Sequence, residues 1–191
     1  MAQTASNAVY SKPKATGCVW SATPGSTLPT DASTELDPAF EGWGYISDDG
    51  IDEGHDFSSD SVKAYGGATV LVIEGGDEVS YEFTPLEYTN PVVQKNLYGD
   101  SNVGTDTDGK TLKSVKLTDD AHVAKPYVFE HVLSNGLIER DVLPSAKVTS
   151  IDTNTYSSGA ALGPKVTVTP FPDESGVKVY KYFAKATGRS E

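Results

Sequence analysis

Carboxylates are the most numerous side chains in the sequence that could take part in catalysis or metal binding. There are 27 acidic residues and 15 basic ones, and the net charge is −12. Acidic residues beside a glycine could form a calcium loop, which needs ligands at alternating positions and a final bidentate Glu. Asp108 fits when positions are counted from Gly109, but Gly104 stands at the first ligand position and Val115 at that of the Glu. The run before Gly54 fails in the same way. We therefore expect no dedicated metal site.

Catalysis by a nucleophile or by general acid–base chemistry would need a histidine near its partner groups. The three histidines, His55, His122 and His131, are scattered, and 99–103 (Gly-Asp-Ser-Asn-Val) lacks the last glycine of a nucleophile elbow. His131 alternates with apolar residues on one strand face, which favours a hydrogen-bonded core or interface role. A paired-carboxylate glycosidase stays open as an alternative, but we favour a solvated or lumen-facing acidic surface and predict no catalytic residues.

Sites for other common ligands are not predicted either. Gly66-Gly67 and Gly75-Gly76 are expected to form turns, because no strand–loop–helix pattern of a phosphate-binding loop surrounds them. The acidic charge disfavours tight binding to nucleic acid, whose affinity depends on basic groups. Cys18 is the only cysteine, which excludes an internal disulfide and a cysteine zinc cluster. No stretch has the length of a transmembrane helix, so we expect no membrane partner. We also expect no cofactor.

The acidic charge is concentrated in residues 31–60, which hold ten acidic side chains and no Lys or Arg. This stretch is not a plain acidic tail, because it contains the aromatic segment 41–50 (Glu-Gly-Trp-Gly-Tyr-Ile-Ser-Asp-Asp-Gly). Residues 1–30 and 110–191 each carry a net charge of +2. An acidic middle between mildly basic ends suits head-to-tail assembly, in which different patches of identical copies meet. The alternative is that the acidity serves solubility alone.

The remaining pattern predicts one mainly β domain over residues 16–191, preceded by a flexible arm over 1–15. Alternation of apolar and polar residues predicts half-buried strands, and Asn135-Gly136 predicts a hairpin turn. Strands are expected over 17–22, 45–46, 57–65, 69–73, 79–83, 127–133, 137–143, 147–151, 165–169 and 177–183.

One segment breaks the β pattern. Asn90 is suited to cap a helix, Pro91 to occupy its first position and Gly99 to end it. Val93 and Leu97, four residues apart, would face the sheet. We expect an antiparallel β-sandwich or barrel-like fold with this one short flanking α-helix, followed by a mobile polar loop over 100–109.

Several segments occur in an order and spacing that are informative together. They are 43–50 (Trp-Gly-Tyr-Ile-Ser-Asp-Asp-Gly), 60–67 (Asp-Ser-Val-Lys-Ala-Tyr-Gly-Gly), 81–87 (Tyr-Glu-Phe-Thr-Pro-Leu-Glu), 96–99 (Asn-Leu-Tyr-Gly), 139–148 (Glu-Arg-Asp-Val-Leu-Pro-Ser-Ala-Lys-Val), 165–169 (Lys-Val-Thr-Val-Thr) and 172–176 (Pro-Asp-Glu-Ser-Gly). Together they resemble the major tail proteins, or tail tube proteins, of long-tailed, siphovirus-type bacteriophages, in particular of phages infecting actinobacteria. The resemblance spans roughly residues 40–185.

The resemblance implies the tail tube fold and assembly into hexameric rings, in which one sheet of each subunit joins its neighbours in an inner barrel. The rings stack head to tail around a tape-measure protein, whose place DNA takes during ejection. Contacts with a tail terminator and with baseplate or distal tail proteins are also implied. The chain would lie in the virion tail, and in the host cytoplasm during assembly. DNA would pass a carboxylate-lined wall without specific binding.

Two groups of acidic residues receive a role as hypotheses. The loops 48–60 and 100–110 are expected to contact adjacent rings or subunits, and 1–15 to reach over a neighbour. The interface residues are Asp48, Asp49, Asp52, Glu53, Asp56, Asp100, Asp106 and Asp108. Glu82, Glu130 and Glu139, on the polar faces of their strands, are the candidates for the lumen.

Other interpretations stay open. A type VI secretion tube protein would share the fold. A monomeric β-sandwich binding module, for example for carbohydrate, would need an exposed aromatic platform, and Trp20 and Trp43 are the only tryptophans. No export signal is visible in residues 1–7, which argues against that module.

Overall fold

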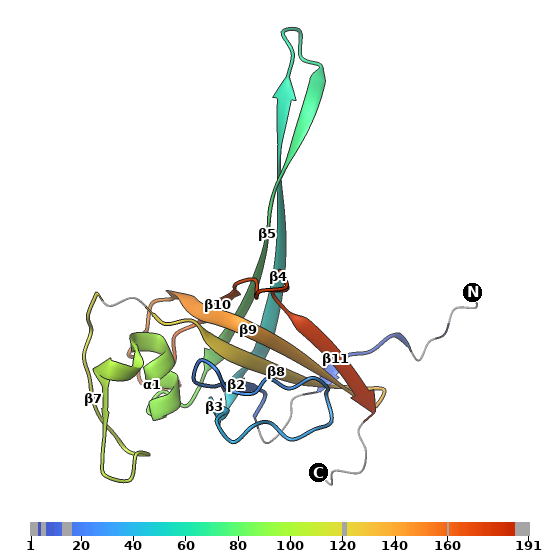
Figure 1. Cartoon of the computed structure of the whole chain (residues 1–191). Helices are drawn as coiled ribbons and strands as arrows, with labels where there is room; N and C mark the ends of the chain where they lie inside the picture. Colours follow the sequence, from blue (N-terminus) through green and yellow to red (C-terminus); the bar gives the residue numbers. More distant parts are fainter. Residues whose placement is uncertain (1–3, 5–6, 13–16, 120–121, 160, 186–191) are drawn as a thin grey trace.

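The computed structural model describes residues 4, 7–12, 17–119, 122–159 and 161–185. Within this part the protein is mainly β, with antiparallel strands and one α-helix, as predicted (Figure 1). The strands are β1 (Ser11–Lys12), β2 (Val19–Ser21), β3 (Glu41–Gly42), β4 (Ile46–Lys63), β5 (Thr69–Pro85), β6 (Val103–Thr105), β7 (Leu112–Val115), β8 (Lys125–Leu133), β9 (Leu137–Ile151), β10 (Val166–Pro170) and β11 (Tyr180–Lys185).

The larger sheet has the order β3-β2-β8-β9-β10-β5-β4, and β1 and β11 join it beside β8 and β9. Strand β9 is shared along its length, because its residues 137–142 pair with β11 whereas 146–151 pair with β10. The sheet can therefore bend along β9 and bring β5 over β8. The stacked rings of Tyr81 and Phe129, with centroids 4.5 Å apart, join the two strands across this bend.

The main core lies in the concave side of the bent sheet. Trp43, Tyr81, Phe83 and Phe129 are almost completely buried there, and the ring of Trp43 lies edge-on to Phe83 at 5.2 Å. Edge-to-face and stacked aromatic pairs stabilise a core beyond their buried area. The aromatic segment around Trp43 is thus structural, as the sequence indicated.

The helix α1 (Pro91–Tyr98) forms as predicted. The side chain of Asn90 accepts a hydrogen bond from the Val92 amide at 2.9 Å, and Pro91 opens the first turn. Val93 and Leu97 are fully buried in the main core. The helix covers one flank of the sheet (Figure 1).

A second, smaller core lies on the other face of β2, β8 and β9. Val128 and Val142 on this face are covered by Ala22 and Phe40, from the ends of the segment 22–40 that crosses it. The stacked rings of Tyr180 and Tyr182 on β11 pack against the same cluster. The bent sheet is thus covered on both sides of β8 and β9.

Three local predictions are wrong. Residues 48–60 are not a loop but part of strand β4. Gly75 and Gly76 do not form a turn, since β5 runs through them and the chain reverses at Gly66-Gly67, as expected there, with φ of 116° and 94°. Residues 100–109 are not wholly a loop, because Asp100–Asn102 form a 3-10 turn and Val103–Thr105 pair with β7.

The predicted flexible arm over residues 1–15 lies largely outside the described residues. Its described part includes β1, where Ser11 and Lys12 pair with Leu133 and Val132 of β8.

Candidate functional site

The long β4–β5 hairpin is the most unusual feature of the molecule. Its root belongs to the main core, but the rest projects far beyond the body as a twisted two-stranded ribbon (Figure 1). Every residue from 55 to 78 is exposed. We call residues 55–78 the distal arm. A two-stranded ribbon without a covered face is at best marginally stable in water.

The distal arm carries apolar side chains on both faces. Val62 is opposite Leu71 on one face, where Ile73 follows two residues further along β5. Val72 lies on the other face, opposite Ser61. These four side chains are between 43% and 57% exposed, and Val70 is 63% exposed. A continuous apolar run such as 70–73 is typical of a strand that is covered on both faces.

The tip of the distal arm presents an aromatic side chain. Gly66 and Gly67 adopt positive φ, and the Gly67 amide donates to the Ala64 carbonyl at 2.9 Å. This tight turn leaves Tyr65 fully exposed at the apex. Tyrosine is one of the residues that most often anchor protein–protein interfaces. The acidic residues of the distal arm, Asp56, Asp60, Glu74, Asp77 and Glu78, outnumber its one base, Lys63.

The root of the hairpin is held by a charged cluster around Lys181 of β11. Its Nζ donates to Oε2 of Glu53 at 2.6 Å and to Oδ2 of Asp141 at 2.9 Å, and lies 3.6 Å from Glu139. The Tyr81 hydroxyl donates to the same Asp141 oxygen at 2.9 Å. We call Glu53, Tyr81, Asp141 and Lys181 the root latch, because they join β4, β5, β9 and β11 through side chains.

Burial and charge shift the pKa values of the root latch. Burial raises the pKa of Glu53, but hydrogen bonds from Lys181 and His55 outweigh it, so the net shift is downward. Burial lowers the pKa of Lys181, and its bonds to Glu53 and Asp141 raise it above the ordinary value. Burial, followed by the charges of Asp141 and Glu53, raises the pKa of Tyr81 far above its usual range. The Tyr81 phenol is therefore neutral at neutral pH, whereas Glu53 and Lys181 are charged.

Asp141 is the member of the root latch that most needs a compensating cation. It is 1% exposed, and its Oδ1 has no hydrogen-bond partner among the described residues. A buried carboxylate is tolerated when a cation compensates it, which Lys181 does through Oδ2. The latch thus depends on Lys181.

The predicted interface residues lie in two separate places. Asp48, Asp49, Asp52 and Asp56 are exposed along β4, and Glu53 of the same strand belongs to the root latch. Asp100, Asp106 and Asp108 lie on the other side of the body, around β6 and β7. Asp100 pairs with Lys125 at 2.6 Å, and Asp106 with Lys113 at 3.1 Å.

The hydrogen bonds of Asp106 and Asp108 are largely local. The Thr107 amide, followed by Lys113, lowers the pKa of Asp106, and the Lys110 and Thr111 amides lower that of Asp108. Asp108 thus stabilises the turn between β6 and β7. The interface role of both groups stays a prediction.

The lumen candidates also differ from one another. Glu82 is 39% exposed and pairs with Lys165 at 2.7 Å, and Glu139 is 20% exposed beside Lys181. Their lumen role stays a prediction. Glu130 is only 4% exposed, so its prediction as a solvent-facing carboxylate is wrong. The physical reason is Arg140 on the neighbouring strand, whose Nε donates to Glu130 at 2.9 Å.

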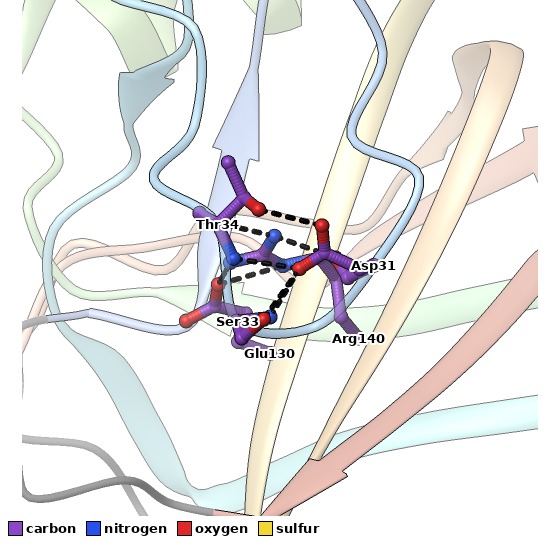
Figure 2. Close-up of polar contacts among 5 residues, drawn as sticks. All are labelled: Asp31, Ser33, Thr34, Glu130 and Arg140. Carbon is purple, nitrogen blue, oxygen red and sulfur yellow. Dashed lines mark hydrogen bonds and ion pairs between the residues drawn. The ribbon is translucent and has the colours of Figure 1, made fainter.

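Figure 2 shows how this buried pair holds the segment that covers the second core. Arg140 also donates through Nη1 to the carbonyl oxygens of Asp31 and Thr34, at 2.7 and 2.9 Å. The side chain of Asp31 accepts hydrogen bonds from the amides and hydroxyls of Thr34 and Ser33. These bonds, with those from Thr34 having the largest effect, lower the pKa of Asp31 well below the usual range. Arg140 and Glu130 are therefore structural, not part of an exposed surface.

The described residues give little support to a metal site, a ligand cavity or a sugar-binding platform. Across the described residues, no group of three His, Cys, Asp or Glu side chains could hold a metal ion. A cavity of about 240 Å³ lies beside α1 and β8, but two of its charged residues, Asp100 and Lys125, pair with each other. Trp43 is fully buried and Trp20 half-buried against the second core, so they form no exposed platform for a sugar.

The sequence interpretation missed two of these features. The apolar run 70–73 was a sufficient signal for a strand needing cover on both faces, but the glycine pairs on either side favoured short strands with turns. The root latch gave no sequence signal, because its members are up to 128 positions apart.

Comparisons with known proteins do not identify the chain. Among its described residues, no helix has the length and apolar character needed to cross a membrane. No protein-family model matches the sequence, and no curated protein matches it significantly.

Proposed function

We propose that this protein is a structural subunit of a bacteriophage tail tube, which assembles into hexameric rings that stack into a conduit for DNA. The observation that carries the proposal is the distal arm. Its backbone forms a ribbon with neither face covered, and its apolar residues are too exposed to stabilise it within one chain. Further copies of the chain would supply the missing cover.

The arm also explains why the subunit would assemble rather than bind a small ligand. A projecting ribbon buries little within its own chain but can lie across a neighbour over its full length. Such contacts between different surfaces of identical copies continue from one copy to the next. A stacked tube is a structure of this kind.

The charge supports the role of a conduit. With a net charge of −12 per chain, a ring would carry a strong negative field, which disfavours retention of DNA phosphates. Glu82 and Glu139 are the remaining candidates for the wall. The tape-measure protein, the tail terminator and the distal tail proteins belong to the same proposal, as does a place in the virion.

Electron microscopy and sedimentation of the purified full chain over a range of concentrations test this function. We expect hollow stacked rings for the wild type and for the control Leu117→Asp, whose 77% exposed side chain lies outside the arm. Leu71→Asp combined with Val72→Asp places a charge on each face of the arm and should leave monomers. A wild-type chain that stays monomeric at every concentration would overturn the proposal.

A further inference from the structure

We infer that the distal arm of one copy docks on the concave face of the sheet at the β1–β8–β9–β11 end of a second copy. We call this surface the acceptor face and define it by His131, Leu133, Leu137, Glu139 and Phe183. The inference rests on the proposed function, since it names the surface through which the copies would meet.

The acceptor face continues the core face of the sheet beyond the point where the core ends. His131 pairs with Glu139, and Glu139 with Phe183, so the three side chains share one face. Phe129, two residues before His131, is on that same face and is fully buried under Tyr81. Phe183, by contrast, is 57% exposed.

The cover of this face stops at the level of Phe129. Neither hydrophobic core of the described residues includes Leu133, Leu137 or Phe183. Leu133 and Leu137 are half-buried on either side of the β8–β9 turn, and with Phe183 they form an apolar strip across three strands. A strip of this kind at the end of a sheet can receive another apolar surface.

The apolar side of the distal arm has the matching composition. Val62, Leu71 and Ile73 share one face, whereas the opposite face has Val70 and Val72 with Ser59, Ser61 and Glu74. The first face can contribute three aliphatic side chains to the acceptor strip. Its acidic member, Asp60, lies opposite Ile73.

Charge favours the same pairing. The distal arm has a net charge of −4 with its histidine neutral. Lys185 on β11 pairs with Leu137 and so lies on the acceptor face, and the acid of this face, Glu139, already lies beside Lys181. An acidic apolar ribbon would thus meet an apolar strip beside the lysines of β11, which steers the encounter and sets its register.

The two surfaces also lie at different ends of the molecule. The arm projects from the body, while the end of β11 and the adjacent β8–β9 turn lie on the far side of the body (Figure 1). One chain could not use its own arm to cover its own acceptor face. Each docked copy would leave a free arm and a free acceptor face, so the contact propagates.

Two complementary variants of the full chain test the inference. Leu71→Asp with Ile73→Asp disables the arm and keeps the acceptor face, whereas Phe183→Asp disables the acceptor face and keeps the arm. Each variant alone should self-associate at least about 30-fold more weakly than the wild type, as expected for loss of an interface hot spot. Mixed together, they should form a one-to-one complex in sedimentation.

A matched control is Tyr156→Asp, which removes a 75% exposed aromatic residue outside both surfaces and should assemble as the wild type does. Circular dichroism shows whether each variant is folded, and an unfolded Phe183→Asp is replaced by Phe183→Ser. If wild type assembles but the mixture forms no complex, or the Phe183 variant assembles normally, this inference is wrong and the proposed function stands. If the wild type itself never assembles, both are wrong.

Discussion

The two halves of the β4–β5 hairpin have the same strand pairing but opposite environments. In the root, Tyr81 and Phe83 alternate with half-exposed polar residues and are buried by β8, Trp43 and the root latch. In the distal arm, the run 70–73 is apolar at every position, yet it is exposed on both faces. The root is therefore stabilised within the chain, whereas the distal arm has no comparable cover among the described residues of one chain.

The largest expected difference comes from truncating one apolar residue in each half. Phe83→Ala should lower the free energy of unfolding by about 3–5 kcal/mol, because it empties part of a closed aromatic core. Leu71→Ala should change it by less than about 0.5 kcal/mol in the monomer, because the side chain is 55% exposed. Denaturant unfolding at concentrations where the chain is monomeric provides both values. A cost near that of Phe83→Ala for Leu71→Ala would show that the arm packs within its own chain.

The second expected effect tests whether a polar residue stabilises the fold when it is buried, in contrast to the exposed apolar residues of the distal arm. Arg140→Met leaves Glu130 buried without its cation and two carbonyl groups without a donor, which should cost about 3 kcal/mol. The double variant Glu130→Leu with Arg140→Met removes the buried carboxylate together with its cation and should recover part of that loss. Unfolding measurements with limited proteolysis of the segment 22–40 check this. A negligible cost would mean that this segment is not held by Arg140.

Some features of this fold can be predicted from the sequence, and others cannot. Helix α1 and the alternating strands around Tyr81 and Phe129 were predictable, because caps and period-two patterns are local signals. The length of β4 and β5 was not, since the acidic, glycine-rich residues 48–60 and 75–76 have low strand propensity and pair only because each strand supports the other. The charge pair of Glu130 and Arg140 required knowledge of register, which alternation alone does not provide.

The smallest expected effect concerns pH and the root latch, where the arm joins the body. Glu53→Gln should cost about 1 kcal/mol at neutral pH, because Glu53 and Lys181 keep about a third of their side chains exposed and water screens their attraction, while Lys181 still compensates the buried Asp141. The pKa of Glu53 is lowered from 4.5, so its contribution is present above that pH and is lost as pH falls through the folded value. The pKa of Lys181 is raised from 10.5, so its contribution is lost only as pH rises above that value.

His55, Asp141 and Tyr81 face the same cluster and remain in the variant. The stability difference between wild type and Glu53→Gln should therefore be flat from about pH 5 to 10 and shrink below it, as thermal unfolding across this range would show. A difference that grows on acidification would mean that the ionised Glu53 carboxylate does not hold the root through Lys181.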